Sequence, residues 1–207
     1  MISRIVALRC VLIIIVVVLL GLTGCLQHAT DPRPLNHQEL PEMAHWVAEE
    51  LDKTIDATEI PHGWHSGPDT TTGTPWDDTQ HPGKADIIRG AHPLSCGENG
   101  GAKIVITLRN TTQGHDTSDI AARVQARWEA NKWVTTHLTT PTATQTHIRA
   151  DRAEEGTLRF QILNNQLTVS AHSPCSVHRS VRERDRYYGW NDPFAGTLDQ
   201  QTRSEHP

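Results

Sequence analysis

Large apolar side chains are scarce in this chain: among 207 residues there are only two Phe, two Tyr and two Met, beside six Trp. The apolar residues gather in a few segments, and the stretches between them are rich in Thr, His, Gly and Pro. Because a domain usually takes about 100 to 150 residues, the length allows one domain with a core of its own. We expect that core to be modest and its loops to be long.

The chain also lacks the short motifs of common enzyme classes. It has no GxSxG turn, no HExxH helix and no Gly-rich phosphate loop, and each of these motifs carries a defined chemical geometry. Ser95, His92 and Asp86 could be assembled into a hydrolytic triad, but a triad depends on geometry and not on closeness along the chain. We therefore expect a non-enzymatic protein without a cofactor.

Positive charge is scarce as well. Nineteen Lys and Arg residues stand against 24 Asp and Glu, which gives a formal net charge of −5. Arg4 and Arg9 are the only charged residues among the first 24, so removal of that segment takes the net charge from −5 to −7. Such a charge repels polyanions. Nucleic acid and anionic lipid are therefore not expected as general partners.

The N-terminus carries the pattern of an exported protein. Arg4 and Arg9 precede the apolar run Cys10–Leu20, which is typical of a secretory signal peptide. Leu22-Thr23-Gly24-Cys25 then resembles a bacterial lipobox, in which cleavage leaves the cysteine as the first residue with a diacylglyceryl group on its thiol. The two acyl chains suffice for stable anchoring. The alternative is an uncleaved membrane anchor over Cys10–Leu26, and both interpretations put the remaining chain outside the membrane.

This pattern predicts a signal peptide over residues 1–24, lipid such as palmitate on Cys25, and a tether over residues 25–34. Cys10 then leaves with the signal, so Cys96 and Cys175 remain as thiols in an oxidising compartment and are expected to pair. In the chain-entropy model, closing so long a loop stabilises the fold by about 4.5 kcal/mol. A catalytic or metal-bound cysteine is the alternative, although neither cysteine lies in a CxxC pair.

Hydrophobic periodicity predicts two amphipathic helices and several strands. The helices cover Leu40–Ile55 and about residues 118–132. The strands cover residues 104–108 and 144–150 and a hairpin of residues 158–162 and 167–171, which turns at Asn164-Asn165. We expect an α+β fold in which both helices pack on one face of a mainly antiparallel sheet.

The predicted domain covers residues 35–175. Residues 56–93 have no sustained apolar pattern and are predicted to form a long irregular loop. Residues 176–207 form a C-terminal extension, of which the last dozen residues are expected to be disordered.

The loop holds the candidate binding residues. The first hypothesis is that it presents a binding surface to a protein partner or an apolar ligand, with Trp64, Trp76 and, from the extension, Trp190 as its exposed aromatic residues. The alternative is that these tryptophans cover a thin core and hold the loop to its edge. The second is a metal site. Its candidate ligands are His62, His65, His81 and His92. Against the metal site, the many prolines of this loop would make a poorly organised cage.

Several features together resemble the small actinobacterial lipoproteins, including the LppA-like group. They are the lipobox, the first helix, Cys96 before a strand, Trp133 at a helix end, and a hairpin that closes on Ser173-Pro174-Cys175. In that group a Gly-Trp pair often ends the helix, and here Lys132 stands in place of the Gly. The resemblance covers about residues 22–175. It implies a fold and a location at the cell envelope but no activity, because most members have none assigned.

Overall fold

The computed structural model describes residues 36–68, 72–97, 100–111, 116–142, 145–152 and 154–182. The chain divides into two units, Met1–Arg33 and Pro34–Pro207, and every described residue belongs to the second. The helices are α2 (Leu40–Thr58), α3 (Lys84–Gly90), α4 (Thr117–Ala130) and α5 (Arg179–Arg182). The strands are β1 (His65–Ser66), β2 (Thr74–Pro75), β3 (Leu94–Ser95), β4 (Ala102–Lys103), β5 (Val105–Thr111), β6 (Val134–His137), β7 (Gln145–Arg152), β8 (Gly156–Leu163) and β9 (Gln166–His172).

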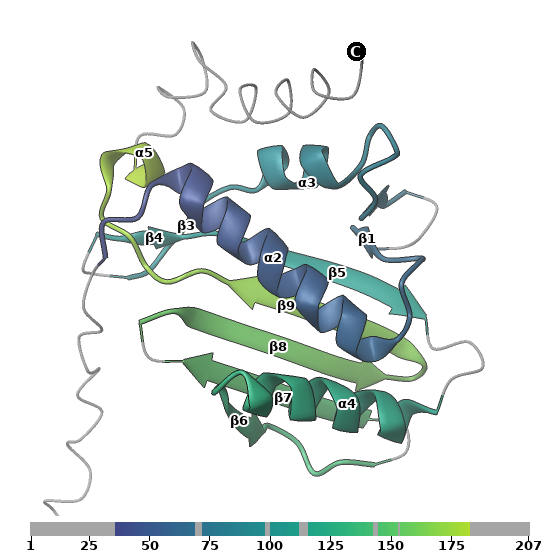
Figure 1. Cartoon of the computed structure of the whole chain (residues 1–207). Coiled ribbons are helices and arrows are strands. Elements are labelled where there is room, and N and C mark those ends of the chain that lie inside the picture. Colours follow the sequence, from purple (N-terminus) through teal and green to yellow (C-terminus); the bar gives the residue numbers. More distant parts are fainter. Residues whose placement is uncertain are drawn as a thin grey trace, which may run out of the picture. The chain divides into compact units, whose positions relative to one another are not determined.

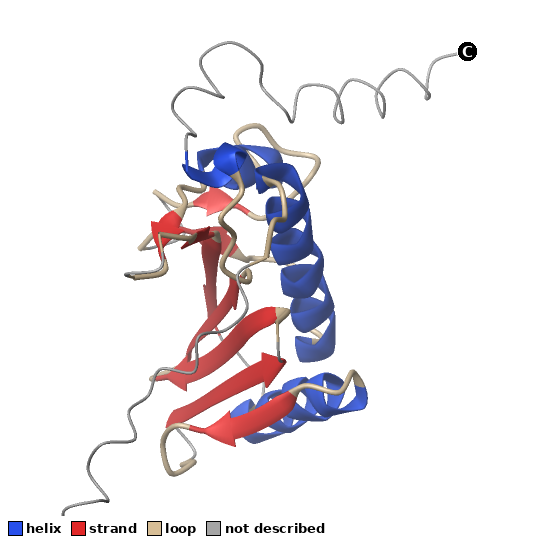
Figure 2. Cartoon of the chain, turned by 90° about the vertical axis from the view of Figure 1, so that its left-hand side faces the viewer, coloured by secondary structure: helices blue, strands red, loops and turns tan. Residues whose placement is uncertain are grey.

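The main sheet has seven strands in the order β2-β1-β5-β9-β8-β7-β6, and all its pairs are antiparallel. A separate pair is formed by β3 and β4. Figures 1 and 2 show α2 and α4 side by side on the same face of the sheet. The predicted α+β architecture, with two helices on one face of an antiparallel sheet, is confirmed.

Local sequence explains the ends of the two large helices. The backbone N–H of Glu39 donates to the Glu42 carboxylate (3.1 Å) at the start of α2, and the Asp116 carboxylate accepts the N–H of Ser118 (2.9 Å) at the start of α4. Both contacts satisfy donors that the first helical turn leaves open. After α4, Lys132 adopts φ = 66°, a conformation that glycine takes more easily.

The predicted hairpin between β8 and β9 is also confirmed. Asn164 and Asn165 form the turn with φ of 49° and 65°, so both lie in the left-handed region that asparagine tolerates. The register pairs Leu158 with Ala171 and Phe160 with Val169, and all four side chains are buried against the helices. Alternate residues of β8 therefore face the core, as the period of two predicts.

The segment 56–93 is more ordered than predicted. It contains β1, β2 and α3, and His65 of β1 pairs with Arg109, which adds β1 to the edge of the main sheet. A strand of two residues is too short to show an alternation in sequence, and its formation depends on a neighbouring strand. The prediction of an irregular loop was wrong for these three elements.

The buried core also continues past the predicted boundary at residue 175. Ser176, Ser180 and Val181 are 0 %, 2 % and 3 % exposed. The Ser180 hydroxyl accepts the backbone N–H of Leu40 (3.0 Å), which lies in the first turn of α2. Residues 176–182 therefore pack as part of the domain. Within the described ranges, no helix combines the length and the hydropathy that crossing a bilayer requires.

Candidate functional site

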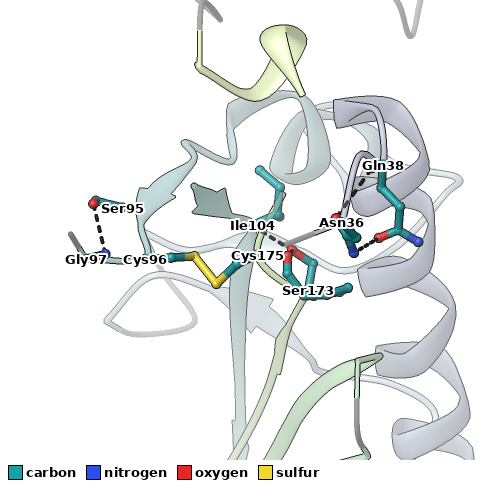
Figure 3. The surroundings of a disulfide bond; sticks show 9 residues. Asn36, Gln38, Ser95, Cys96, Gly97, Ile104, Ser173 and Cys175 are labelled. Carbon is teal, nitrogen blue, oxygen red and sulfur yellow. Dashed lines mark hydrogen bonds between the residues drawn. A yellow bond between two sulfur atoms is a disulfide. The ribbon is translucent and has the colours of Figure 1, made fainter. Parts of the chain in front are cut away.

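The predicted disulfide is present, and it lies at the end of the domain where the described chain begins. Cys96 and Cys175 are bonded with their Cα atoms 6.2 Å apart, and Figure 3 shows Asn36, the first described residue, next to Cys175. The N–H of Asn36 donates to the Cys175 carbonyl (3.3 Å), and the N–H of Val177 donates back to the Asn36 carbonyl (3.0 Å). We call this group, Asn36 with Cys96, Cys175 and Ser176, the N-terminal clamp.

Further hydrogen bonds hold the clamp to β4 and to the residues around the end of β9. Ala102 and Ser176 exchange two N–H···O bonds of 2.9 and 2.8 Å. The Ser173 hydroxyl accepts the N–H of Ile104 (2.9 Å), and the N–H of Ser173 donates to the Ile104 carbonyl (2.9 Å). The point where the preceding chain joins the domain is therefore fixed to β4 and to the end of β9. Cys25, the predicted lipidation site, lies outside the described residues.

A pocket of about 860 Å³ opens on the segment predicted to bind a ligand. It is lined by Pro61, His62, Gly63, Trp64, His65, Gly73, Pro75, Trp76, Asp77, Asp78, Thr79 and Gln80. His65 is 5 % exposed, and its Nδ1 lies 3.2 Å from the Gly63 carbonyl. Because a carbonyl only accepts, Nδ1 donates in this contact. Nε2 is buried and has no hydrogen-bond partner among the described residues.

The four histidines proposed as metal ligands do not come together. His62 and His65 line the pocket, whereas His81 pairs with Asp86 (3.1 Å) and His92 is exposed beyond α3. Among the described residues, no group of three or more His, Cys, Asp or Glu side chains is arranged to hold a metal ion.

The tryptophans of this segment have structural contacts. Trp64 is 2 % exposed and its indole N–H donates to the Ile60 carbonyl (2.7 Å), so Trp64 belongs to the core, as the alternative interpretation had it, and is not an exposed binding residue. Trp76 is half-buried and donates to the Asp52 carboxylate (2.8 Å). The Lys84 ammonium, 2.7 Å from Asp52, lies over the Trp76 ring at 5.2 Å. Trp76 therefore joins the pocket to α2 and α3, and Trp190 lies outside the described residues.

The residues considered for a triad have separate local partners. The Asp86 carboxylate accepts the N–H of Gly83 (2.9 Å) and contacts His81, while the exposed Ser95 hydroxyl accepts the N–H of Gly97 (3.2 Å). In the described part of the chain, no hydrogen bond or ion pair joins Ser95 to His92 or Asp86.

A basic group on the face of the sheet away from the helices was not predicted. Arg159 of β8 is directly opposite Arg149 of β7, and His172 of β9 lies in the next row. Burial and the charges of Arg159, Lys103 and Arg149 lower the pKa of His172 from 6.5 to about 4, so this imidazole is neutral near pH 7. A single sequence cannot show this group, because it depends on strand register.

Comparison with known proteins identifies no family and a distant structural similarity. No protein-family model matches the chain, and no curated protein matches it. Among solved structures it is similar to a DUF4853 family protein from Actinomyces odontolyticus, with 14% sequence identity over 70% of this chain and 73% of that chain and a TM-score of 0.43. The LppA-like resemblance has no counterpart in these comparisons.

Proposed function

We propose that the mature chain is a non-enzymatic lipoprotein of the cell envelope, held at the extracytoplasmic face of the membrane by lipid on Cys25. The observation that carries this proposal is the sequence Leu22-Thr23-Gly24-Cys25 directly after an apolar run and two arginines. The resemblance to LppA-like lipoproteins supports the same location. Two acyl chains on one thiol would hold the protein stably, whereas one chain would not.

Two structural observations support the proposal. The disulfide between Cys96 and Cys175 is the bonding expected in an oxidising compartment outside the cytoplasm. The eleven residues from Cys25 to Asn36 would reach at most about 40 Å when extended, so an anchored domain would stay close to the bilayer. A pull on this tether would act on Asn36, whose bonds to Cys175 and Val177 lie beside the covalent link.

Labelling of the lipid tests the anchor. The full chain is expressed in an actinobacterial host fed an alkyne analogue of palmitate, and label on the purified protein is measured for the wild type, Cys25→Ser and Cys10→Ser. We expect label on the wild type and on Cys10→Ser, because Cys10 lies in the segment that cleavage removes. We expect none on Cys25→Ser. A labelled Cys25→Ser protein or an unlabelled wild type would refute the anchor.

The binding role is assigned to the pocket over residues 61–80. Its lining combines the apolar surfaces of Pro61, Pro75 and Trp76 with the polar side chains of His62, Thr79 and Gln80. Apolar walls with a few polar groups suit an apolar ligand or a partner side chain that carries one polar group.

Nile red, a neutral apolar dye, probes this pocket. We expect its fluorescence to rise with the wild-type chain and the rise to be strongly reduced by Trp76→Ala. Val134→Ala is the control, because Val134 is 70 % exposed and lies on β6, at the opposite edge of the sheet. Equal loss in both variants, or no response from the wild type, would count against the pocket as an apolar site.

A further inference from the structure

We infer that the basic group on the open face of the sheet docks on anionic phospholipid headgroups of the membrane that holds the protein. This inference rests on the proposed anchor at Cys25. It goes beyond that anchor, because it assigns an orientation to the domain: the open face lies toward the bilayer and the helices lie away from it.

The group is built by the register of four strands. Thr107, Ser170, Arg159 and Arg149 are directly opposite one another across β5, β9, β8 and β7. Directly opposite residues of an antiparallel pair project from the same face of the sheet, with Cβ atoms only about 5 Å apart. Two arginines and two hydroxyl groups therefore form one continuous row on the open face.

Two cations that lie opposite each other repel, and only one of them has a counter-charge. Arg149 is bound to Asp151 through its Nε (2.7 Å) and its Nη2 (2.7 Å). None of the described carboxylates pairs with Arg159, and its Nε is buried without a hydrogen bond. An oxyanion placed over the half-buried Arg159 guanidinium would reduce this repulsion and provide the counter-charge that Arg149 already has in Asp151.

Neighbouring charges make the same face more positive. Lys103 and Arg159 both act on His172, which lies in the row next to Arg159. Arg109 lies farther along β5 and donates to a neutral partner, the Gly67 carbonyl (2.7 Å). Among the described carboxylates, Asp151 lies in the row of His172, where it is paired with Arg149. At the nearby turn, Glu155 is paired with Arg152 (2.9 Å).

The position of the group in the domain favours the bilayer as the source of the oxyanion. His172 ends β9, three residues before Cys175, and Lys103 follows Ala102, which is bonded to Ser176. The basic group thus lies at the end of the sheet that joins the N-terminal clamp. A tether from the membrane reaches the domain at that same end, so the headgroups nearest to the anchor are also nearest to these cations.

Weak attraction is sufficient in this arrangement. A cation near an anionic bilayer changes the binding constant by only about five-fold. A tether of about ten residues, however, gives the domain a millimolar effective concentration at the surface. The net charge of the whole chain is a poor guide to this face, because many of the described carboxylates lie on α2, α3 and α4 and not on these strands.

Modification of arginine on vesicles tests the inference. The chain from residue 25 onward is coupled through the Cys25 thiol to a maleimide lipid, in vesicles of phosphatidylcholine alone or with phosphatidylglycerol. Phenylglyoxal then modifies accessible arginines, and mass spectrometry gives the rate at Arg159 and at Arg127, which is exposed on α4 and serves as the internal control. Chemical coupling replaces biological lipidation, so this result does not depend on the outcome of the palmitate labelling.

We expect phosphatidylglycerol to slow modification of Arg159 roughly three-fold or more and to leave Arg127 unchanged. The protection should disappear in about 1 M salt, where screening acts over about 3 Å. Arg149→Gln should weaken the protection of Arg159, whereas Arg127→Gln should not. Equal rates at Arg159 on both vesicles, or equal protection of Arg127, would overturn the inference.

Discussion

Neighbouring residues on β8 have opposite surroundings. Phe160 is 0 % exposed in the core under the helices, whereas Arg159 and Gln161 on either side of it lie half-buried on the open face. The same alternation continues on β9, where Val169 is buried and Thr168 and Ser170 are half-buried. One face of the sheet therefore provides the stability of the fold, and the other is left for polar and charged groups that the fold does not require.

The largest expected effect comes from removing a core side chain. Phe160→Ala should reduce the free energy of unfolding by about 3–5 kcal/mol, because it deletes a fully buried ring and leaves a cavity. Gln161→Ala, one residue further on the open face, should change it by less than about 0.5 kcal/mol. Urea unfolding of both variants measures the difference. Similar losses would mean that the open face is packed after all.

Loss of the disulfide should have the next largest effect, because the bond between Cys96 and Cys175 restricts the unfolded chain. Cys96→Ser/Cys175→Ser should lower the free energy of unfolding by about 2–4.5 kcal/mol, since the bond closes a loop with a sequence separation of 79. Thermal unfolding with and without reductant gives the control: reductant should destabilise the wild type and leave the double variant unchanged. A reductant-insensitive wild type would contradict the pairing.

A smaller effect, on pH dependence, is expected from the open face. His172 has a folded-state pKa of about 4 against an ordinary value of 6.5, because burial and nearby cations disfavour its protonation. The unfolded chain therefore binds the proton more readily, and stability is lost as the pH falls from about 6.5 towards 4. His172→Gln should flatten this decline by on the order of 1 kcal/mol, allowing for solvent screening of a partly exposed group.

The control for this measurement is His92→Gln, since His92 is exposed in a loop. Unfolding free energies at several pH values compare both variants with the wild type. If His172→Gln retains the wild-type decline, the imidazole is not held neutral by its surroundings.

The smallest effect is a stabilisation at the link between the helix layer and the sheet. Lys132, two residues after the end of α4, has φ = 66°, a conformation that costs a residue with a side chain about 1–2 kcal/mol. Lys132→Gly should raise the free energy of unfolding by about 0.5–1 kcal/mol after the greater chain entropy of glycine is subtracted. Lys132→Ala removes the charge without relieving the backbone and should not stabilise the fold.

Much of the fold could be predicted where residues repeat with a period. The alternation of Leu158, Phe160 and Ile162 identified β8 and the face it buries, and the spacing in Leu40–Ile55 identified α2. The pairing of Cys96 with Cys175 followed from assigning the other two cysteines, and the structure confirms it. The helix and the strand are visible in residues close together along the chain. The disulfide follows from the number of cysteines, because only two remain once Cys10 and Cys25 are assigned.

The candidate site was harder to predict because it depends on contacts distant in sequence. Trp76 is held by Asp52 of α2, 24 residues earlier in the chain, and β1 exists because His65 pairs with Arg109. The buried serines of residues 176–182 are polar, so no hydrophobic pattern marks that segment. The opposition of Arg149 and Arg159 requires the register of β7 and β8, and a shift by one residue would separate them.

The central claim is that Cys25 becomes the lipid-bearing first residue of the mature protein. The most direct test is the intact mass of the protein extracted from membranes of an actinobacterial host, with fragmentation of its N-terminal peptide. The account predicts a chain that begins at Cys25, lacks residues 1–24 and carries a diacylglyceryl group on the thiol. A chain that retains residues 1–24, or one that begins at Cys25 without lipid, would contradict it.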